Sequence, residues 1–256
     1  MIGSFAILLT TLEEAKKMVA AANASKRVTA VNFCHRCKDR HLIARRVIRD
    51  GTIGKIRSYS GRYRFLLPST FSPRDRPFII ASLGGFGALG EFDSHQFDMF
   101  SFLTGRPINS VSGHLSWAEP DVADLRANTA YHLVVKSGNG VSASLEHTEP
   151  PGNWSHLYWN IYVEGTQGYL SIEGGQNGQV EIRLENDDSA TVVTPIDEEM
   201  TTPFMTDGVV ADFVAAIRNS TKKPILPTFE DGLSSLAVLM AVLEADRRCT
   251  WVEVAR

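Results

Sequence analysis

Hydrophobic positions near the start of the chain alternate between strand-like and helix-like spacing. Residues 5–9 are a short apolar run, and residues 27–33 are rich in β-branched positions. Between them, apolar side chains recur every three or four residues: Leu12, Ala15, Met18, Val19 and Ala22. Thr11 and Glu14 form a capping box that begins this helix. The pattern predicts a β-α-β unit, the repeating piece of a parallel sheet.

From residue 55 onward the pattern changes to strands joined by short, glycine-rich turns. The strand-like runs cover residues 55–65, 108–117, 128–136, 141–147, 157–164, 168–172 and 179–184. Tyr131, Leu133 and Val135 alternate with the more polar series His132, Val134 and Lys136. We therefore predict an antiparallel meander with one buried face and one face that is either wet or covered by a partner.

Helical spacing returns at residues 42–49, 208–218 and 231–247, the last of these preceded by a capping pair at Thr228 and Asp231. The expected fold class is α+β, a large open mostly antiparallel sheet with helices on one face, preceded by the β-α-β unit. The change from a β-α-β pattern to strands joined by short turns places a domain boundary near residues 34–40.

Composition narrows the functional classes. The chain has 256 residues, 43% hydrophobic and 21% charged, with a net charge of -3. Without a Lys/Arg block, we expect no nucleic-acid partner. The apolar run at residues 5–9 is too short to span a bilayer, and it lacks the flanks of a signal peptide, so we expect no membrane partner. Three cysteines, an odd number, argue against a disulfide framework and favour a cytoplasmic location.

A glycine cluster at residues 85–90 matches the G-x-G-x-x-G pattern of dinucleotide-binding loops. That fingerprint needs a parallel crossover after it and an acidic residue about 20 positions on. Here the next segments read as a hairpin, so we interpret the glycines as a close-packed entry to a helix.

That helix carries Glu91, His95 and Asp98. Glu91 and His95 are one turn apart, and a carboxylate at that distance can fix the tautomer of an imidazole and hold it ready for acid–base work. A surface ion pair and metal ligation are the alternatives. Only two metal ligands are local, whereas zinc uses three or four.

Six segments in order resemble the Gfo/Idh/MocA oxidoreductases, a family that includes glucose-fructose oxidoreductase and inositol dehydrogenase. Residues 87–98 resemble its G-x-L-x-D-x-G-x-H-x-x-D helix. The other matching segments are residues 10–15, 31–36, 48–56, 163–170 and 231–254. The resemblance covers nearly the whole chain and implies that residues 37–256 are a substrate and dimerisation domain.

The resemblance also implies roles for individual residues. His95 corresponds to the family's proton-relay histidine, and Glu91 replaces an aspartate of the same substrate pocket. Asp93 replaces a glycine, and the sequence offers no account of this carboxylate. Arg36 matches a family arginine near the substrate. Because the family pairs through its sheet, a homodimer through the open sheet face is expected.

The nucleotide-binding half of the family is largely missing from the sequence. Residues 1–36 correspond to a remnant of its doubly wound, Rossmann-type sheet, and the family's catalytic lysine aligns with Ala6. Holding a nicotinamide requires the phosphate cradle of that half. We therefore expect that this chain alone binds no cofactor, and we assign no cofactor-binding and no metal-binding residue.

Further residues are candidates for the site. Cys34 and Cys37 form a C-x-x-C, for which local packing, redox chemistry and metal binding are the alternatives. The remaining substrate-binding candidates, together with Arg36 and Asp98, are Tyr63, Arg74, Arg76, Trp154 and His156. Arginine favours an acidic ligand, and tryptophan can stack on a sugar ring. The alternatives are a solvated loop charge for the arginines and core packing for the tryptophan.

Three functions follow. The first is a cofactor-independent lyase, isomerase or cyclase that uses His95 on a small polyhydroxylated or carbonyl substrate. The second is a sugar or polyol dehydrogenase subunit that works with a full-length, nucleotide-binding partner. The third is a non-catalytic dimeric binding module or a truncated remnant. The sequence leaves open whether the chain is an enzyme, and it excludes only an autonomous nicotinamide-dependent dehydrogenase.

Overall fold

The structure is a computed structural model of the chain. It describes residues 11–64, 88–91, 93–117, 128–138, 140–148, 158–174, 179–185, 191–193, 207–218 and 226–255. The helices are α1 (Leu12–Ser25), the 3-10 helix η1 (Cys34–Cys37), α2 (Asp39–Arg49), α3 (Ala88–Glu91), α4 (Asp93–Thr104), α5 (Asp207–Ile217) and α6 (Phe229–Arg248). No helix in these ranges combines the length and the apolar character needed to cross a membrane.

Among the described residues, nine strands form one open sheet in the order β8-β7-β6-β5-β1-β4-β3-β2-β9. They are β1 (Ile56–Arg64), β2 (Ile108–Trp117), β3 (Asn128–Ser137), β4 (Ser142–Thr148), β5 (Tyr158–Gly165), β6 (Gly168–Glu173), β7 (Val180–Leu184), β8 (Thr191–Val193) and β9 (Val252–Glu253). All neighbours pair antiparallel except β1 and β4, which run parallel. The predicted antiparallel meander is confirmed, and β1 joins its two halves.

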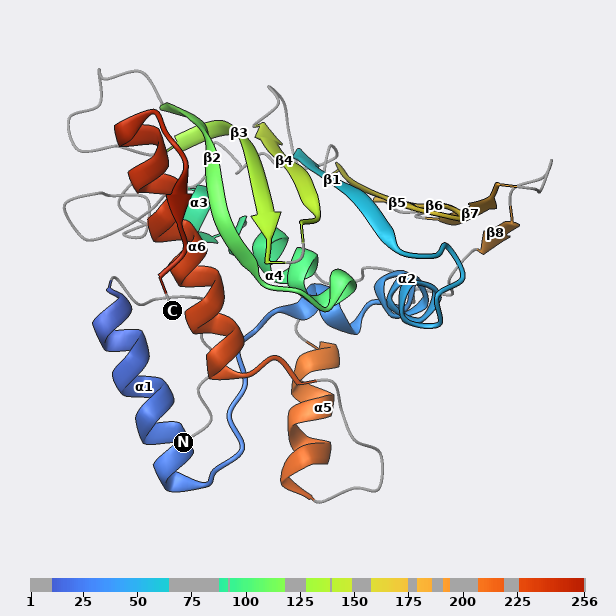
Figure 1. The fold of residues 1–256 in the computed structure, drawn as a ribbon. Helices are drawn as coiled ribbons and strands as arrows, with labels where there is room; N and C mark the ends of the chain where they lie inside the picture. Colours follow the sequence, from blue (N-terminus) through green and yellow to red (C-terminus); the bar gives the residue numbers. More distant parts are fainter. Residues whose placement is uncertain are drawn as a thin grey trace, which may run out of the picture.

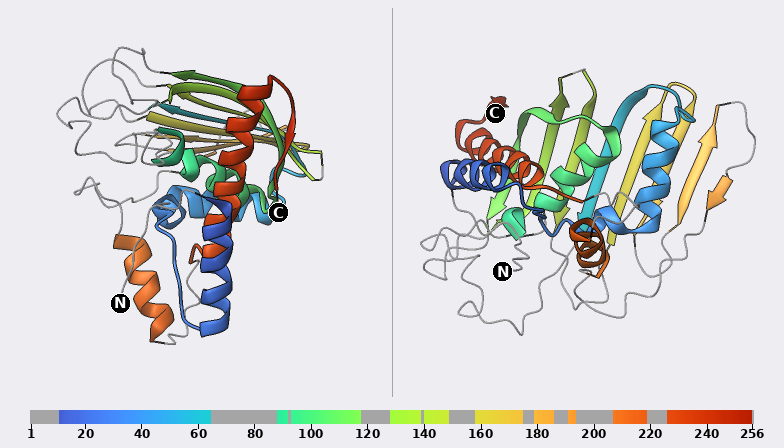
Figure 2. Two further views of the ribbon diagram at one scale, coloured as in Figure 1. Left: turned by 90° about the vertical axis from the view of Figure 1, so that its left-hand side faces the viewer. Right: turned by 90° about the horizontal axis from the view of Figure 1, so that it is seen from below.

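The helices α2, α4 and α6 cover one face of the sheet, and no helix of the described residues lies on the opposite face, here called the bare sheet face (Figures 1 and 2). Alternation along the strands produces this asymmetry. Tyr131, Leu133 and Val135 are buried beneath the helices, whereas Val134 on the opposite face is 46% exposed. The core between sheet and helices consists of large apolar side chains such as Phe97 of α4 and Leu239 of α6. The predicted fold class is therefore confirmed.

The N-terminal β-α-β unit is only partly observed. Helix α1 begins as predicted, because the Thr11 side chain accepts a hydrogen bond from the backbone N–H of Glu14. The predicted strand at residues 27–33 is wrong, since these residues belong to no strand, although the Val31 N–H donates to the Pro227 carbonyl. β-branched residues need a neighbouring strand to complete a ladder, and none of the described segments offers one. The strand predicted at residues 5–9 lies outside the described residues.

Helix α1 packs along α6, beside the helical layer of the main sheet (Figure 1). Helix α6 begins with the predicted capping box, in which Thr228 and Asp231 each satisfy a backbone amide of the other. The chain between α1 and α2 therefore passes the start of α6. Helix η1, which follows this segment, lies near one end of the sheet. This route positions the candidate site.

Candidate functional site

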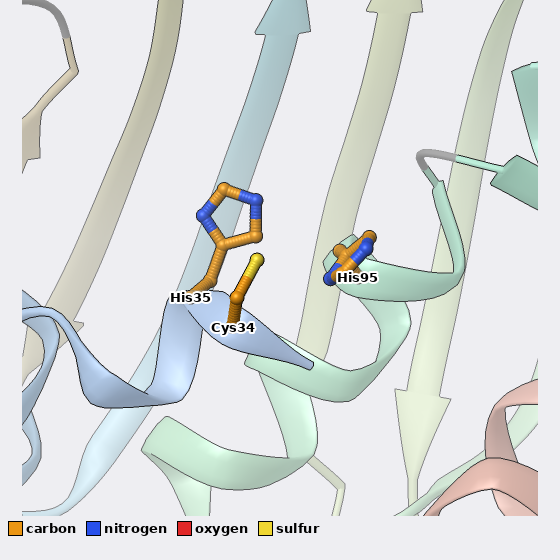
Figure 3. A group of neighbouring side chains, drawn as sticks. All are labelled: Cys34, His35 and His95. Carbon is orange, nitrogen blue, oxygen red and sulfur yellow. The ribbon is translucent and has the colours of Figure 1, made fainter. Parts of the chain in front are cut away.

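A thiol and two imidazoles meet where η1 passes the start of α4 (Figure 3). One ligand-type atom each from Cys34, His35 and His95 lies within 4.8 Å of the other two. We call these three residues the thiol–imidazole cluster. Cys34 and His35 are buried in η1, and His95 is partly exposed in the first turn of α4. The cluster thus joins two segments that are far apart in the sequence.

Aromatic rings surround the cluster on the inner face of the sheet. The His35 ring packs edge-on against His95, with centroids 5.0 Å apart, and against Trp159 of β5 at 4.9 Å. Tyr63 at the end of β1 lies 6.3 Å from His35, and Phe33 lies 5.5 Å from His95. β1 and β5 are adjacent strands, so Tyr63 and Trp159 occupy paired positions. The ends of these two strands form the wall against which both imidazoles rest.

Several polar atoms of this region are buried and unsatisfied. Among the described residues, no hydrogen-bond partner is available to Nδ1 of His35, Nδ1 of His95, the Tyr63 hydroxyl or Nε1 of Trp159. Leaving a buried polar atom without a partner costs about 1–3 kcal/mol. Four such atoms around one cluster indicate that the cluster binds a further polar group or ion.

Burial keeps both imidazoles of the cluster neutral. It lowers the pKa of His95 to about 4 and holds that of His35 well below its usual value, where the nearby His95 and His41 add to the effect. Burial also raises the pKa of the Cys34 thiol to about 11. At neutral pH the cluster therefore offers two imidazoles that can accept a proton, donate a hydrogen bond or bind a metal, beside a protonated thiol.

The C-x-x-C pair is not arranged as a reactive dithiol. Cys37 is half-buried, its Sγ atom lies 4.0 Å from Oδ2 of Asp212, and burial raises its pKa to about 11 as well. Neither thiol is therefore a thiolate at neutral pH, although thiolate character is what makes a cysteine nucleophilic. Of the sequence alternatives, the geometry favours packing for Cys37.

Arg36 and Asp98, two predicted substrate-binding residues, are directed at each other. Nε of Arg36 donates to Oδ2 of Asp98 at 2.8 Å, and Nη2 lies 2.9 Å from Oδ1 of Asp231 in α6. Arg36 and Asp98 are both buried. This ion triad holds η1, α4 and α6 together, and so fixes the position of the thiol–imidazole cluster next to it.

Asp93, for which the sequence offered no account, lies beside a buried histidine. Its Oδ1 is 2.9 Å from Nδ1 of His147, and both side chains are fully buried. The His147 ring also packs against Tyr131, whose hydroxyl donates to the side-chain oxygen of Gln96. The carboxylate in the first turn of α4 therefore belongs to an internal polar network between α4, β3 and β4.

The other predicted site residues are placed less completely. Glu91 ends α3, and its side chain lies outside the described part of the chain, as do Arg74, Arg76, Trp154 and His156. The structure brings Tyr63 and His95 to the same region. Sequence reasoning missed His35 and Cys34 as neighbours of His95. The sequence signal that could have identified these two residues is the resemblance of residues 31–36 to a strand end that lies next to the substrate in the family.

The described part of the glycine cluster does not lie in a dinucleotide-binding loop. Of the glycine cluster at 85–90, Gly90 lies in α3, and the following α4 leads to β2. β2 pairs antiparallel with β3 and β9, whereas a dinucleotide loop opens the helix of a parallel crossover. This part of the chain provides no phosphate cradle of that kind.

Comparison with known proteins agrees with the fold. The family profile of the GFO/IDH/MocA C-terminal domain matches residues 41–171. Levoglucosan dehydrogenase of Pseudarthrobacter phenanthrenivorans is 24% identical over 287 residues, which cover 96% of this chain and 72% of that protein.

Two solved structures illustrate the shared fold. An NAD binding oxidoreductase from Klebsiella pneumoniae superimposes with a TM-score of 0.81 at 22% identity, over 97% of this chain and 72% of the other. An aldose-aldose oxidoreductase from Caulobacter crescentus gives 0.77 at 18% identity, over 96% and 70%. At these identities the likeness shows a common fold.

Proposed function

This chain belongs to the GFO/IDH/MocA family, and we propose that it binds a small polyhydroxylated or carbonyl compound at the thiol–imidazole cluster, with His95 exchanging a proton with the substrate. The observation that carries the proposal is the state of His95. Its imidazole is neutral, partly exposed, and holds an Nδ1 atom without a partner among the described residues. A neutral imidazole next to a substrate hydroxyl can take its proton.

The surroundings of His95 suit a sugar-like ligand. Tyr63 and Trp159 add buried hydroxyl and indole N–H groups that lack a partner in the described chain. Sites of this type combine apolar ring surfaces with a few convergent polar groups. The relative from Pseudarthrobacter is a dehydrogenase of levoglucosan, an anhydrosugar, which supports the substrate class.

Two forms of the proposal share this proton transfer. In the first, the chain acts without a nicotinamide as a lyase, isomerase or cyclase. In the second, it is the substrate-binding part of a sugar or polyol dehydrogenase, with a full-length partner that supplies the nucleotide site. The dehydrogenase relatives favour the second form.

The His95→Ala variant tests the shared step. We expect the wild-type chain to bind levoglucosan, or the L-sorbose found in a solved complex of levoglucosan dehydrogenase, with a dissociation constant of about 1 mM or below. His95→Ala should weaken this binding by about tenfold, because one hydrogen bond to the ligand is lost. Isothermal titration calorimetry measures both values.

The matched control is His114→Ala. His114 lies on β2 with its side chain 79% exposed and contacts Asp246 of α6, whereas the cluster lies on η1 and α4. This variant should bind like the wild type. Equal affinities for the wild type and His95→Ala would contradict the proposal, and so would the absence of binding to either sugar. Adding NADH together with a full-length homologue to the same titration separates the two forms, since only the second predicts an effect.

We propose further that the bare sheet face pairs with a second copy of the chain. This face carries Val134 and Tyr162, which are 46% and 39% exposed, among polar side chains such as Arg62 and Glu146, which form an ion pair. A stable interface buries about 800 Å² on each partner. An open sheet face of several strands offers a continuous surface of this kind.

Val134→Asp should raise the dimer dissociation constant at least about tenfold, because it would bury an unpaired charge in the interface. Sedimentation velocity over a concentration series measures the change. Val28→Asp is the control, since Val28 is 41% exposed but lies outside the sheet. A wild-type chain that remains monomeric at tens of micromolar would contradict the dimer.

A further inference from the structure

The thiol–imidazole cluster has the composition and spacing of a transition-metal site. Its three donor atoms lie within 4.8 Å of one another. In a tetrahedral zinc site, bond lengths of about 2.0–2.3 Å place neighbouring donors about 3.3–3.6 Å apart. Rotations that move each of the three side chains by less than about 1 Å would close this difference, which is within the reach of ordinary rotamer adjustment.

The unsatisfied nitrogens give a second, independent reason. Nδ1 of His35 and Nδ1 of His95 are both buried and lack a hydrogen-bond partner among the described residues. His35 as a whole is only 8% exposed, so solvent reaches little of it. Buried imidazole nitrogens without partners are an expensive arrangement for a core that serves packing alone. A cation between the three side chains would bind one nitrogen of each imidazole.

Binding of a divalent ion would change the charge of the cluster. The Cys34 thiol would release one proton to solvent and bind as a thiolate, since a coordinated thiol is deprotonated outright. The site would then carry one net positive charge, from a divalent ion and one thiolate.

We propose that Cys34, His35 and His95 bind a zinc ion, with a fourth position left for water or for an oxygen of the substrate. A thiolate with two imidazoles suits zinc and excludes magnesium and calcium, which prefer oxygen ligands. Three protein ligands and one open position are the arrangement of catalytic zinc sites, whereas structural sites use four protein ligands.

A group outside the three ligands supports the geometry. Nδ1 of His41 in α2 lies 2.6 Å from the carbonyl oxygen of His35, and His41 is fully buried. This bond holds the backbone of η1 at the residue that would bind the metal. The Arg36–Asp98 pair fixes the same short helix to α4, from which His95 projects. The two segments that supply the ligands are therefore tied together from both sides.

Metal binding does not require the proposed function, on which only the identity of the fourth ligand rests, but bound zinc would take the proton-transfer role away from His95. With zinc bound, a substrate hydroxyl or carbonyl oxygen at the open position would be polarised by the ion. A nitrogen of His95 that binds zinc no longer accepts the proton. The metal-bound oxygen then becomes the more acidic group of the site.

The test is a titration of the full chain, stripped with a chelator, with Co²⁺ as a spectroscopic probe and then with Zn²⁺. We expect one equivalent of Co²⁺ to give intense visible bands of tetrahedral cobalt and a thiolate-to-cobalt charge-transfer band. One equivalent of Zn²⁺ should then displace it. Because outer-shell partners of a metal ligand are worth about 10–100-fold in affinity, removing a ligand itself should cost more than about 100-fold.

The ligand variants are Cys34→Ser, His35→Gln and His95→Gln, and the controls are Cys37→Ser and Cys249→Ser. Cys37 lies in the same η1 helix and Cys249 is exposed, so both report on adventitious thiol binding. Circular dichroism of each variant shows whether it folds. The charge-transfer band should disappear in Cys34→Ser and remain in both controls.

Absence of stoichiometric Co²⁺ binding by the wild type would overturn the metal site. A band that survives in Cys34→Ser, or disappears in Cys37→Ser, would overturn the assignment of the thiol. If a ligand variant fails to fold, the other two still decide, because each must lose affinity. Zinc binding without any sugar binding, in the presence or absence of zinc, would uphold the metal site and contradict the proposed function.

Discussion

Replacing Arg36 with methionine should lower the free energy of unfolding by about 3–5 kcal/mol, because it leaves the Asp98 carboxylate buried without a counter-charge. Asp98 is only 3% exposed, and Arg36 donates to both of its oxygens. Methionine keeps most of the side-chain volume, so the loss measures the charge. Urea unfolding at pH 7, followed by circular dichroism, gives the free energy.

The control for this prediction is Arg62→Met. Arg62 forms the same type of contact with Glu146, its Nε lying 2.8 Å from Oε2, but its side chain is 59% exposed. An exposed pair contributes about 0–1 kcal/mol, so this variant should unfold close to the wild type. Losses of equal size in Arg36→Met and Arg62→Met would mean that burial of the triad has no energetic consequence.

The second large effect is a loss of stability as the pH falls from about 6.5 to 4. Burial lowers the pKa of His41 to about 3 and that of His95 to about 4, while an unfolded histidine titrates near 6.5. Between these values the unfolded chain binds protons that the folded chain does not. The stabilisation that each neutral imidazole contributes is therefore fully present above the pKa of an unfolded histidine. It is lost on acidification, by roughly 3 kcal/mol for each of these histidines at pH 4.

Two other groups change the size of this effect. The pKa of His35 is also well below its usual value because of burial, so it adds to the loss. Burial raises the pKa of Asp98 to about 6 even though Arg36 opposes the rise, so Asp98 acts in the opposite direction over the same range. The net uptake on unfolding at pH 5 should be about two protons. Urea unfolding at several pH values measures this number as a slope.

The His41→Gln variant isolates one contribution. It should reduce the proton uptake by about one, whatever its effect on stability at pH 7, because only one titrating group is removed. His132→Gln serves as the control, since His132 lies on the exposed series of β3. A chain whose stability is constant between pH 7 and 4, or an unchanged slope in His41→Gln, would show that the buried imidazoles are protonated in the folded state.

Local signals in the sequence determined the elements and their buried faces. The alternation at Tyr131, Leu133 and Val135 predicted which side of β3 faces the helices, and the capping pairs at Thr11 and Thr228 located two helix starts. Such signals depend on neighbours within a few residues, which the sequence displays directly. The ordered motifs were sufficient to identify the family and to select His95.

Only the tertiary structure decided what surrounds His95. Cys34 and His35 precede it by two helices and a strand, and nothing in local periodicity indicates that η1 meets α4. The pairing of Asp93 with His147 likewise depends on how α4 crosses β4, which explains a carboxylate that sequence reasoning could not.

The prediction of a strand at residues 27–33 was wrong for the same reason, because it depended on contacts between distant segments. Its β-rich composition is real, but a strand also needs a partner, and partners come from the fold. By itself, the sequence determined which residues are apolar, capped or titratable. Contacts between distant segments decided which of them became neutral, paired or available to a ligand, because burial and charge pairing are properties of the packed chain.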